Sequence, residues 1–328
     1  MKNKIGTVTS VKLAEICGVS QGTVDRAINN RPGISPKTKE RVLKAAKEYG
    51  YIKNMNASFL SLGKTKLLGL VVFDFNNEFF AELTASVEQK ATELGYSVLI
   101  AVSNKNIDKE KDAIERLLSF GVDGVILCPV GFGAEYEEII SKYQKPVMMV
   151  SNKAGEKFPF IGADDEIAMM NITNQVVEKG YKNTVLYIPP MRYLGQTNIY
   201  AQKIRADAYQ KVIEETKVGG SIVTLEDDVI ANIKNSGEKT AVLCASDIYA
   251  LRLLKRLKKE GLSVPEDVGV TGFDNIASLD FFEKRLTTVN YPIKKIGETA
   301  AEQLLNIIED KPTKSYSLEC TVVQGETL

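Results

Sequence analysis

Residues 9–30 read TSVKLAEICGVSQGTVDRAINN and decide the fold of the amino-terminal part of the chain. Either Thr9 or Ser10 can cap a first helix, because a hydroxyl accepts a hydrogen bond from the backbone N–H groups of the first turn, and Gly18 can end it. Ser20 is a good N-cap for a second helix. The pattern therefore predicts two short helices joined by a tight turn.

Each of these helices has an apolar face. At 100° per residue, the face expected to be buried carries Leu13, Ile16 and Cys17 in the first helix, and Val24, Ala27 and Ile28 in the second, which we place at 21–30. The opposite arc of the second helix carries side chains suited to reading base edges or gripping phosphates: Gln21, Gly22, Asp25, Arg26 and Asn29.

A third helix is expected next, with Ser35 as its cap and Pro36 at its first position. It carries Val42, Leu43, Ala46 and Tyr49 before Gly50. Three short helices with a tight turn between the first two make a helix-turn-helix, which is a DNA-binding motif.

The charges favour the same interpretation. The net charge of the whole chain is zero, but residues 1–66 carry 13 Lys and Arg against 4 Asp and Glu, and the remainder carries 29 against 38. A basic amino-terminal segment followed by an acidic remainder indicates a nucleic-acid-binding module, because contacts with phosphates supply most of the non-specific affinity for DNA. The alternative, a small helical docking domain, would not need this concentration of positive charge.

The composition limits the other possibilities. With 328 residues, 44% of them apolar and 26% charged, the chain is typical of a globular protein of two or three domains. No apolar stretch reaches the roughly 18 residues that span a bilayer, and the start lacks the apolar core of a signal peptide. We therefore expect a cytoplasmic protein without membrane contact.

Catalysis and metal binding have little support in the sequence. The chain contains no histidine, which is the commonest general base and the commonest metal ligand, and no nucleotide-binding or nucleophile motif occurs. Its four cysteines lie in apolar stretches without CxxC spacing, so we interpret Cys17, Cys128, Cys244 and Cys320 as buried thiols. We expect no catalytic residue, no metal and no cofactor.

From residue 66 onwards, apolar stretches of strand length alternate with amphipathic segments of helix length. The stretches are 67–73, 97–102, 124–130, 146–151, 184–188, 221–225, 240–245 and 268–272, and the helical segments include 81–94, 113–120, 167–179, 199–215 and 248–260. This alternation predicts parallel sheets covered by helices on both faces. The number of strands exceeds what one compact sheet holds.

Polar and aromatic side chains follow several of these strands. In open α/β sheets, ligands bind at the carboxyl ends of strands, and acids, amides and ring faces suit a polyol. The candidates are Asp74, Asn76 and Asn77 with Phe79 and Phe80, then Ser246 and Asp247, then Asp274 and Asn275. Plainer roles stay open: Asp247 as a helix N-cap, Asp164 and Asp165 as caps of the next helix, and Phe79 and Phe80 as ordinary core.

The sequence also resembles a known family. The runs 19–30 and 34–42 are similar to the DNA-binding headpiece of the lactose/galactose repressor family, and the similarity continues through Gly50, Tyr51 and Asn54 to Gly63 and Thr65. It then covers nearly the whole chain, including the segments 69–72, 77–83, 122–127, 264–268, 272–274 and 286–289.

The resemblance implies a domain organisation. A small all-α helix-turn-helix headpiece would occupy residues 1–50, a hinge helix and linker 51–65, and a two-lobed α/β effector domain of the periplasmic-binding-protein-like type I 66–328. Lobe 1 would contain about 66–162 and 292–318, and lobe 2 about 163–291 and 319–328. The chain would cross between the lobes near Gly162, near 290–292 and near 318–320.

The resemblance also implies DNA contacts. They would come from Thr9, Ser20, Gln21, Gly22, Thr23, Asp25, Arg26 and Asn29, and from Asn54, Ala57 and Leu60 of the hinge, with Leu60 wedged into the minor groove. Three positions depart from the family pattern: Gly22, Asp25 in place of a serine, and Lys53 in place of a proline. Asp25 could accept from a cytosine amine or pair with Arg26 or a neighbouring lysine, and we favour the pairing.

Carried over residue by residue, the effector contacts would be Asn77, Phe79 and Phe80 of lobe 1, Arg205, Ser246, Asp247 and Asp274 of lobe 2, and Asn290 at a crossover, with Asp74 beside them. Two positions depart from the family's sugar-binding pattern. Gly131 stands where an acidic residue is common, and Ser246 stands where an asparagine is common.

The function implied is transcription regulation. We expect a DNA-binding regulator, a repressor, whose affinity for a near-palindromic operator depends on a sugar-like effector and which acts as a homodimer or a higher assembly. The alternatives are a fused solute-binding protein and a sugar-acting α/β enzyme, both of which the basic headpiece disfavours.

Overall fold

The computed structural model describes residues 8–52, 63–190 and 200–328. It divides into two compact units, Met1–Thr65 and Lys66–Leu328, and each is considered by itself. The hinge positions Asn54, Ala57 and Leu60, for which DNA contacts were expected, lie outside the described residues, as does Lys53.

The first unit contains the three expected helices, α1 (Ser10–Cys17), α2 (Gln21–Ile28) and α3 (Pro36–Glu48). Each begins at a hydroxyl cap: Thr9 accepts from the N–H of Lys12, Ser20 from Thr23 and Ser35 from Thr38. The helix-turn-helix prediction is therefore confirmed.

Two details of this unit differ from the predictions. Ile16 is 37% exposed, because the buried arc of α1 is centred on Leu13 and Cys17 and takes Ala14 on its other side. Helix α2 ends at Ile28, two residues before the predicted Asn30, which has a positive φ of 53°. Val24, Ala27, Val42 and Ala46 complete the small core.

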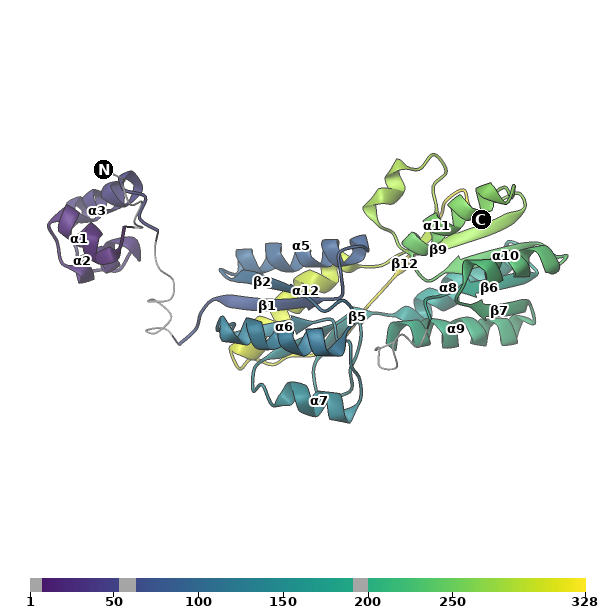
Figure 1. The fold of residues 1–328 in the computed structure, drawn as a ribbon, viewed down its shortest axis with the longest axis horizontal. Coiled ribbons are helices and arrows are strands. Elements are labelled where there is room, and N and C mark those ends of the chain that lie inside the picture. Colours follow the sequence, from purple (N-terminus) through teal and green to yellow (C-terminus); the bar gives the residue numbers. More distant parts are fainter. Residues whose placement is uncertain (1–7, 53–62, 191–199) are drawn as a thin grey trace. The chain divides into compact units, whose positions relative to one another are not determined.

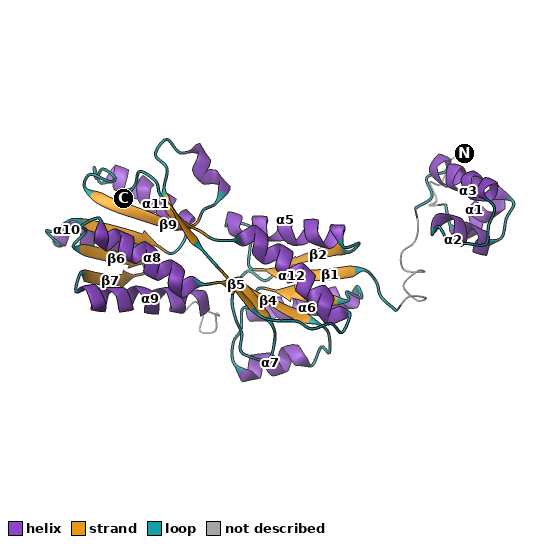
Figure 2. Ribbon diagram, turned by 180° about the vertical axis from the view of Figure 1, so that it is seen from behind, coloured by secondary structure: helices purple, strands orange, loops and turns teal. Residues whose placement is uncertain are grey.

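The second unit contains two six-stranded sheets, each between layers of helices (Figures 1 and 2). We call lobe 1 the part built on the sheet with the order β11-β5-β4-β3-β1-β2, in which all neighbouring strands are parallel. Its strands are β1 (Leu67–Val72), β2 (Ser97–Val102), β3 (Gly124–Leu127), β4 (Val147–Val150), β5 (Phe160–Ala163) and β11 (Tyr316–Leu318), and its helices are α5 (Glu78–Glu93), α6 (Ile107–Ser119), α7 (Ala134–Ser141) and α12 (Ile293–Ile308).

Lobe 2 is built on the sheet with the order β12-β10-β9-β8-β6-β7, in which only the pair of β10 and β12 is antiparallel. Its strands are β6 (Asn183–Tyr187), β7 (Gly219–Val223), β8 (Thr240–Cys244), β9 (Val268–Asp274), β10 (Thr287–Asn290) and β12 (Thr321–Val323). Its helices are α8 (Asp165–Glu178), α9 (Tyr200–Thr216), α10 (Glu226–Asn235), α11 (Asp247–Lys259) and the 3₁₀ helix η1 (Ala277–Phe281).

The chain passes from one sheet to the other three times: after β5, after β10 and after β11. One apolar core extends across both lobes, from Leu83 of α5 and Ile296 of α12 to Ile172 of α8 and Tyr209 of α9. The fold is thus the expected two-lobed α/β arrangement, and the crossovers bring residues far apart in sequence to the lobe junction.

Among the described residues of this unit, four strands and four helices were not predicted. They are β5, β10, β11 and β12, the helices α7, α10 and α12, and the 3₁₀ helix η1. The four cysteines are free and buried, as predicted. Among the described residues, no helix is long and apolar enough to cross a membrane.

Candidate functional site

Two groups of predicted residues lie on separate units, and the first is the exposed side of α2. Gln21, Gly22 and Arg26 are exposed there, opposite the buried Val24 and Ala27. Gln21 donates from Nε2 to Ser10 Oγ of α1 at 2.9 Å, so its amide is oriented by the neighbouring helix. This surface has the donors and the cation that contact with base edges and phosphates requires.

Within the described part of the headpiece, Asp25 pairs with Arg31 and not with Arg26 or a lysine. Its Oδ2 lies 3.0 Å from the Nη1 of Arg31, and its Oδ1 accepts from the side-chain amide of Asn29 at 2.7 Å. The chain returns after Asn30 so that Arg31 N donates to Arg26 O at 2.8 Å, which brings the guanidinium of Arg31 back alongside α2. Asp25 therefore holds the end of α2 to the turn that follows it. The prediction that Asp25 pairs with a neighbouring basic residue is confirmed, but the partner is Arg31 and not Arg26 or a lysine.

The second group gathers where the two lobes meet. Asp274 ends β9, is 5% exposed and has a positive φ of 117°, which is rare for any residue except glycine. Burial raises the pKa of its carboxyl group well above the usual range; Arg205 acts against this rise, and so does a hydrogen bond with the side chain of Asn77. Asn77 belongs to lobe 1, so this contact joins the lobes.

Asn77 is also the N-cap of α5, where its side chain accepts from Phe79 N at 3.1 Å. Phe79 and Phe80 are both buried: the ring of Phe79 packs edge-on against Tyr291, and that of Phe80 against Phe73. The two phenylalanines thus belong to the core at the lobe junction.

Arg205 of α9 is buried in an ion pair with Asp165, the first residue of α8. Nε and Nη2 each lie 2.7 Å from Asp165 Oδ1, and Nη1 donates to the carbonyl of Ala245 at 2.8 Å. The guanidinium also lies 3.6 Å from the ring centroid of Phe273. Burial opposes the charge of Arg205, but the neighbouring acids raise its pKa above the ordinary value.

Asp165 belongs to the candidate site through Arg205, although its place in the sequence predicted mainly a capping role. Its Oδ2 accepts from the hydroxyl of Tyr291 at 3.3 Å, and burial raises the pKa of its carboxyl group although Arg205 opposes the change. Asp164, not Asp165, caps α8, since its side chain accepts from Ile167 N. Neither Asp165 nor Tyr291 could be selected from the sequence, because only the crossovers bring them to Arg205.

Asp247 has no exposed surface and holds the loop after β9 by hydrogen bonds. Its Oδ1 accepts from Thr288 Oγ1 at 2.6 Å and its Oδ2 from Ile276 N at 2.9 Å. Burial raises the pKa of Asp247 to about 6. It is not the N-cap of α11, a position that Ser246 occupies. Asp247 therefore fixes the segment that carries Asp274.

The remaining candidates are less enclosed. Asp74 is half-buried and its Oδ1 accepts from Asn76 N at 2.8 Å, while Asn290 is exposed and accepts from the side chain of Asn275 at 3.1 Å. Ser246 is half-buried and makes no side-chain capping bond.

Gly131 has a structural reason to lack a side chain. A Cβ atom built at this position would lie 2.1 Å from the ring of Tyr136, whose hydroxyl donates to the buried Glu110 at 2.6 Å. The other oxygen of Glu110 accepts from Val130 N at 2.7 Å. The loop after β3 is thus held by Glu110 and Tyr136, and an acid at position 131 has no room.

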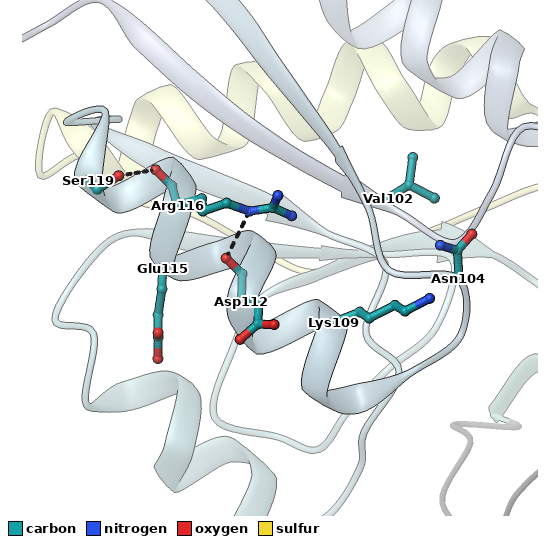
Figure 3. A pocket seen from close by; sticks show the side chains of 7 residues that line it. All are labelled: Val102, Asn104, Lys109, Asp112, Glu115, Arg116 and Ser119. Carbon is teal, nitrogen blue, oxygen red and sulfur yellow. Dashed lines mark hydrogen bonds between the residues drawn. The ribbon is translucent and has the colours of Figure 1, made fainter.

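A separate hollow of about 660 Å³ lies beside the edge strand β2 and helix α6. Figure 3 shows its lining, in which Lys109 extends toward Asn104 and the Nε of Arg116 donates to the backbone carbonyl oxygen of Asp112. None of the predicted site residues lines it. The lobe junction, not this hollow, brings together Asn77, Arg205 and Asp274.

The chain is similar to characterised regulators. Residues 12–54 match the family model for bacterial regulatory proteins of the lacI family, and residues 173–328 match that for a periplasmic binding protein-like domain. The chain is 30% identical to the HTH-type transcriptional regulator reg1 of Streptomyces lividans, with 97% of each chain covered.

Two solved structures share the fold. The lac repressor dimer bound to operator and the anti-inducer ONPF has a TM-score of 0.84 at 22% identity, covering 98% of this chain and 99% of that one. A LacI family regulator of Enterococcus faecium with bound ribose has a TM-score of 0.69 at 20% identity, covering 80% of this chain and 98% of that one. The chain belongs to the LacI family of bacterial regulatory proteins and is a sequence-specific DNA-binding transcriptional regulator.

Proposed function

We propose that this regulator is a repressor whose affinity for its operator is set by a small, polyhydroxylated effector, a sugar or sugar derivative, that binds at the lobe junction against Asp274. The observation that carries the proposal is the environment of Asp274. A carboxylate at a strand end, buried, at a positive φ and hydrogen-bonded to the other lobe, is a costly arrangement. Such cost is typical of functional sites.

The chemistry of the surroundings supports a neutral polyol. Carboxylate oxygens accept from hydroxyl groups, the amide of Asn77 both donates and accepts, and an aromatic ring such as that of Phe79 suits the C–H face of a sugar. The ribose bound to the Enterococcus faecium regulator is a ligand of this class. Among the described residues, Asp165 and the carbonyl oxygen of Ala245 take three of the five N–H groups of Arg205, and the other two would donate to a ligand oxygen.

DNA recognition is assigned to α2 and the caps around it. The exposed Gln21 and Arg26 and the half-buried Thr23 would meet base edges and phosphates, with Thr9 and Ser20 at the ends of the helices close to the backbone of the duplex. One helix of eight residues covers few base pairs, so we propose a homodimer on a near-palindromic site.

The test of the effector site uses the full-length protein and the variant Asp274→Asn. Asparagine keeps the size and tolerates positive φ, so the variant should fold and bind DNA selected from a random pool as the wild type does. A panel of D-ribose, D-xylose, D-glucose and D-fructose is screened by thermal shift, since a ligand that binds only the folded state must raise the melting temperature.

We expect at least one sugar to raise the melting temperature of the wild type and to change its DNA affinity, and both responses to disappear in Asp274→Asn. Asp280→Asn, an exposed position six residues further on, is the matched control. A sugar response that survives in Asp274→Asn would exclude Asp274 from the site.

A further inference from the structure

One contact between the lobes involves none of the predicted effector residues. The carboxylate of Glu78, at the first position of α5 in lobe 1, accepts two hydrogen bonds from Ser278 in η1 of lobe 2. Ser278 N donates to Oε2 at 3.2 Å, and Ser278 Oγ donates to Oε1. The contact is half-buried and joins residues 200 positions apart in sequence.

The two partners lie next to the candidate effector residues. Glu78 follows Asn77, and Ser278 lies four residues after Asp274. The side chain of Asn77 also lowers the pKa of the Asp274 carboxyl group, so the start of α5 acts on the 274–278 segment both at Asp274 and at Ser278. Each lobe thus uses one short segment both for the candidate site and for the contact between lobes.

The segment from Asp274 to Phe281 is held from both sides. Within lobe 2, Asp247 accepts from Ile276 N, and from lobe 1 Glu78 accepts from Ser278 N. At its far end Phe281 is 87% exposed, although Leu279 is buried. A movement of α5 relative to lobe 2 would therefore act on this segment through Glu78.

We propose that Glu78 is a positioning residue of the effector site. By holding Ser278, Glu78 fixes the 274–281 segment against lobe 1 and couples effector binding at Asp274 to the exposed end of η1. The proposal rests on the proposed effector site. Hydrogen bonds to a charged acceptor are the stronger kind, and two of them on one carboxylate restrict the rotation of one lobe against the other. Glu78 thereby preorganises the site without touching the ligand.

The first experiment needs no ligand. Amide hydrogen exchange is measured on the full-length protein for peptides that cover 274–281 in the wild type, Glu78→Ala, Glu78→Gln and Glu88→Ala. Glu88 is an exposed carboxylate on the same helix and accepts a hydrogen bond from Thr92 one turn later, so Glu88→Ala removes the same charge as Glu78→Ala. Glu78→Ala should exchange about tenfold faster there, because the acceptor of Ser278 N is lost.

Glu78→Gln keeps an acceptor oxygen and should retain most of the protection, and exchange in β8 and β9 should be unchanged in all variants. Ser278→Ala removes the hydroxyl bond from the other side and gives an independent variant if Glu78→Ala folds poorly. Equal exchange of 274–281 in Glu78→Ala and Glu88→Ala would overturn the proposal.

The second experiment is titration with whichever of D-ribose, D-xylose, D-glucose or D-fructose stabilises the wild type. Glu78→Ala should weaken its binding about tenfold, with rescue by Glu78→Gln and no change in Glu88→Ala. Unchanged binding in Glu78→Ala would contradict the positioning role. If no sugar binds the wild type, the proposed function fails, and the exchange experiment alone decides whether Glu78 holds the segment.

Discussion

Glu110 is a carboxylate with no exposed surface in lobe 1, and its two oxygens accept from Tyr136 and from Val130 N. Burial raises its pKa to about 7, against the stabilising effect of these two hydrogen bonds on the charged form. Between pH 4.5 and 7 the folded protein keeps a proton on Glu110 that the unfolded chain has released. Raising the pH in this window therefore favours unfolding.

We predict that Glu110→Gln removes this pH dependence. Relative to the variant, the free energy of unfolding of the wild type should fall by about 3 kcal/mol from pH 4.5 to 7 and be level above it. Glutamine can accept from Val130 N and donate to Tyr136, so the loop after β3 should persist. Urea denaturation at several pH values measures the difference, with the exposed Glu135→Gln as control. Parallel curves for wild type and Glu110→Gln would refute the assignment.

Asp165 and Arg205 form a buried ion pair. In Asp165→Asn the guanidinium would remain buried beside Phe273 without its carboxylate, which for such pairs costs about 3–5 kcal/mol. We predict a loss of this size in urea denaturation. Glu166→Gln, next in sequence and exposed beside Lys211, should change stability by less than about 1 kcal/mol. Equal effects of the two variants would show that the buried pair is not needed for stability.

For individual residues, the sequence predicted which positions belong to the candidate site, but it did not predict which side chains they contact. Asp274 was selected because it follows a predicted strand, and Arg205 because the family resemblance implies it, and both are buried. Their partners Asp165 and Asn77 come from other elements, and only the topology of the crossovers brings them together. The same is true of Asp25, whose partner Arg31 depends on the turn at Asn30.

The elements that were not predicted have weak local signals in the sequence. Helices α7, α10 and α12 begin after Gly133, Leu225 and Pro292, and none of them has a side-chain capping bond. The expected helices α1, α2, α3 and α8 begin at hydroxyl or carboxylate caps, but α11 was also expected and has no such bond, so capping is only part of the cause. The missed strands have three or four residues, which gives little apolar pattern to distinguish them from a loop; β3 and β4 are as short, but they lie in the longer apolar stretches 124–130 and 146–151.

Helix α2 is the element that we expect to read DNA, and Arg26 is its exposed cation. Arg26→Ala should weaken binding to the selected operator by about 1–3 kcal/mol and relax the preference at one position of each half-site. Arg41→Ala removes the same charge from the exposed side of α3 and should weaken binding to all sequences alike. Affinities for the operator and for single-base variants of it are compared. If both variants change affinity uniformly across sequences, Arg26 contacts only phosphate.

The whole effector unit exposes apolar side chains on both lobes. In lobe 1, Ile100 on the edge strand β2 is 45% exposed, and in lobe 2, Phe281 and Phe282 at the end of η1 are 87% and 48% exposed. Exposed aromatic side chains beside one another are typical of protein interfaces. An interface that includes both lobes would connect the angle between them to the arrangement of the two headpieces, which is how an effector could change DNA affinity.

We therefore predict that Phe281→Asp prevents dimer formation without unfolding the protein. The side chain is almost fully exposed, so its replacement should leave the melting temperature of the monomer nearly unchanged, whereas a carboxylate buried in an interface between two copies has no partner. Phe120→Asp changes a phenylalanine that is 66% exposed at the end of α6 and serves as the control. Sedimentation velocity at micromolar concentration should give a dimer for the wild type and Phe120→Asp and a monomer for Phe281→Asp. Because two half-sites must be bound together, the monomeric variant should also lose most of its operator affinity while its effector response in thermal shift persists. A dimeric Phe281→Asp would show that η1 lies outside the interface, and the contact would then have to be sought at β2.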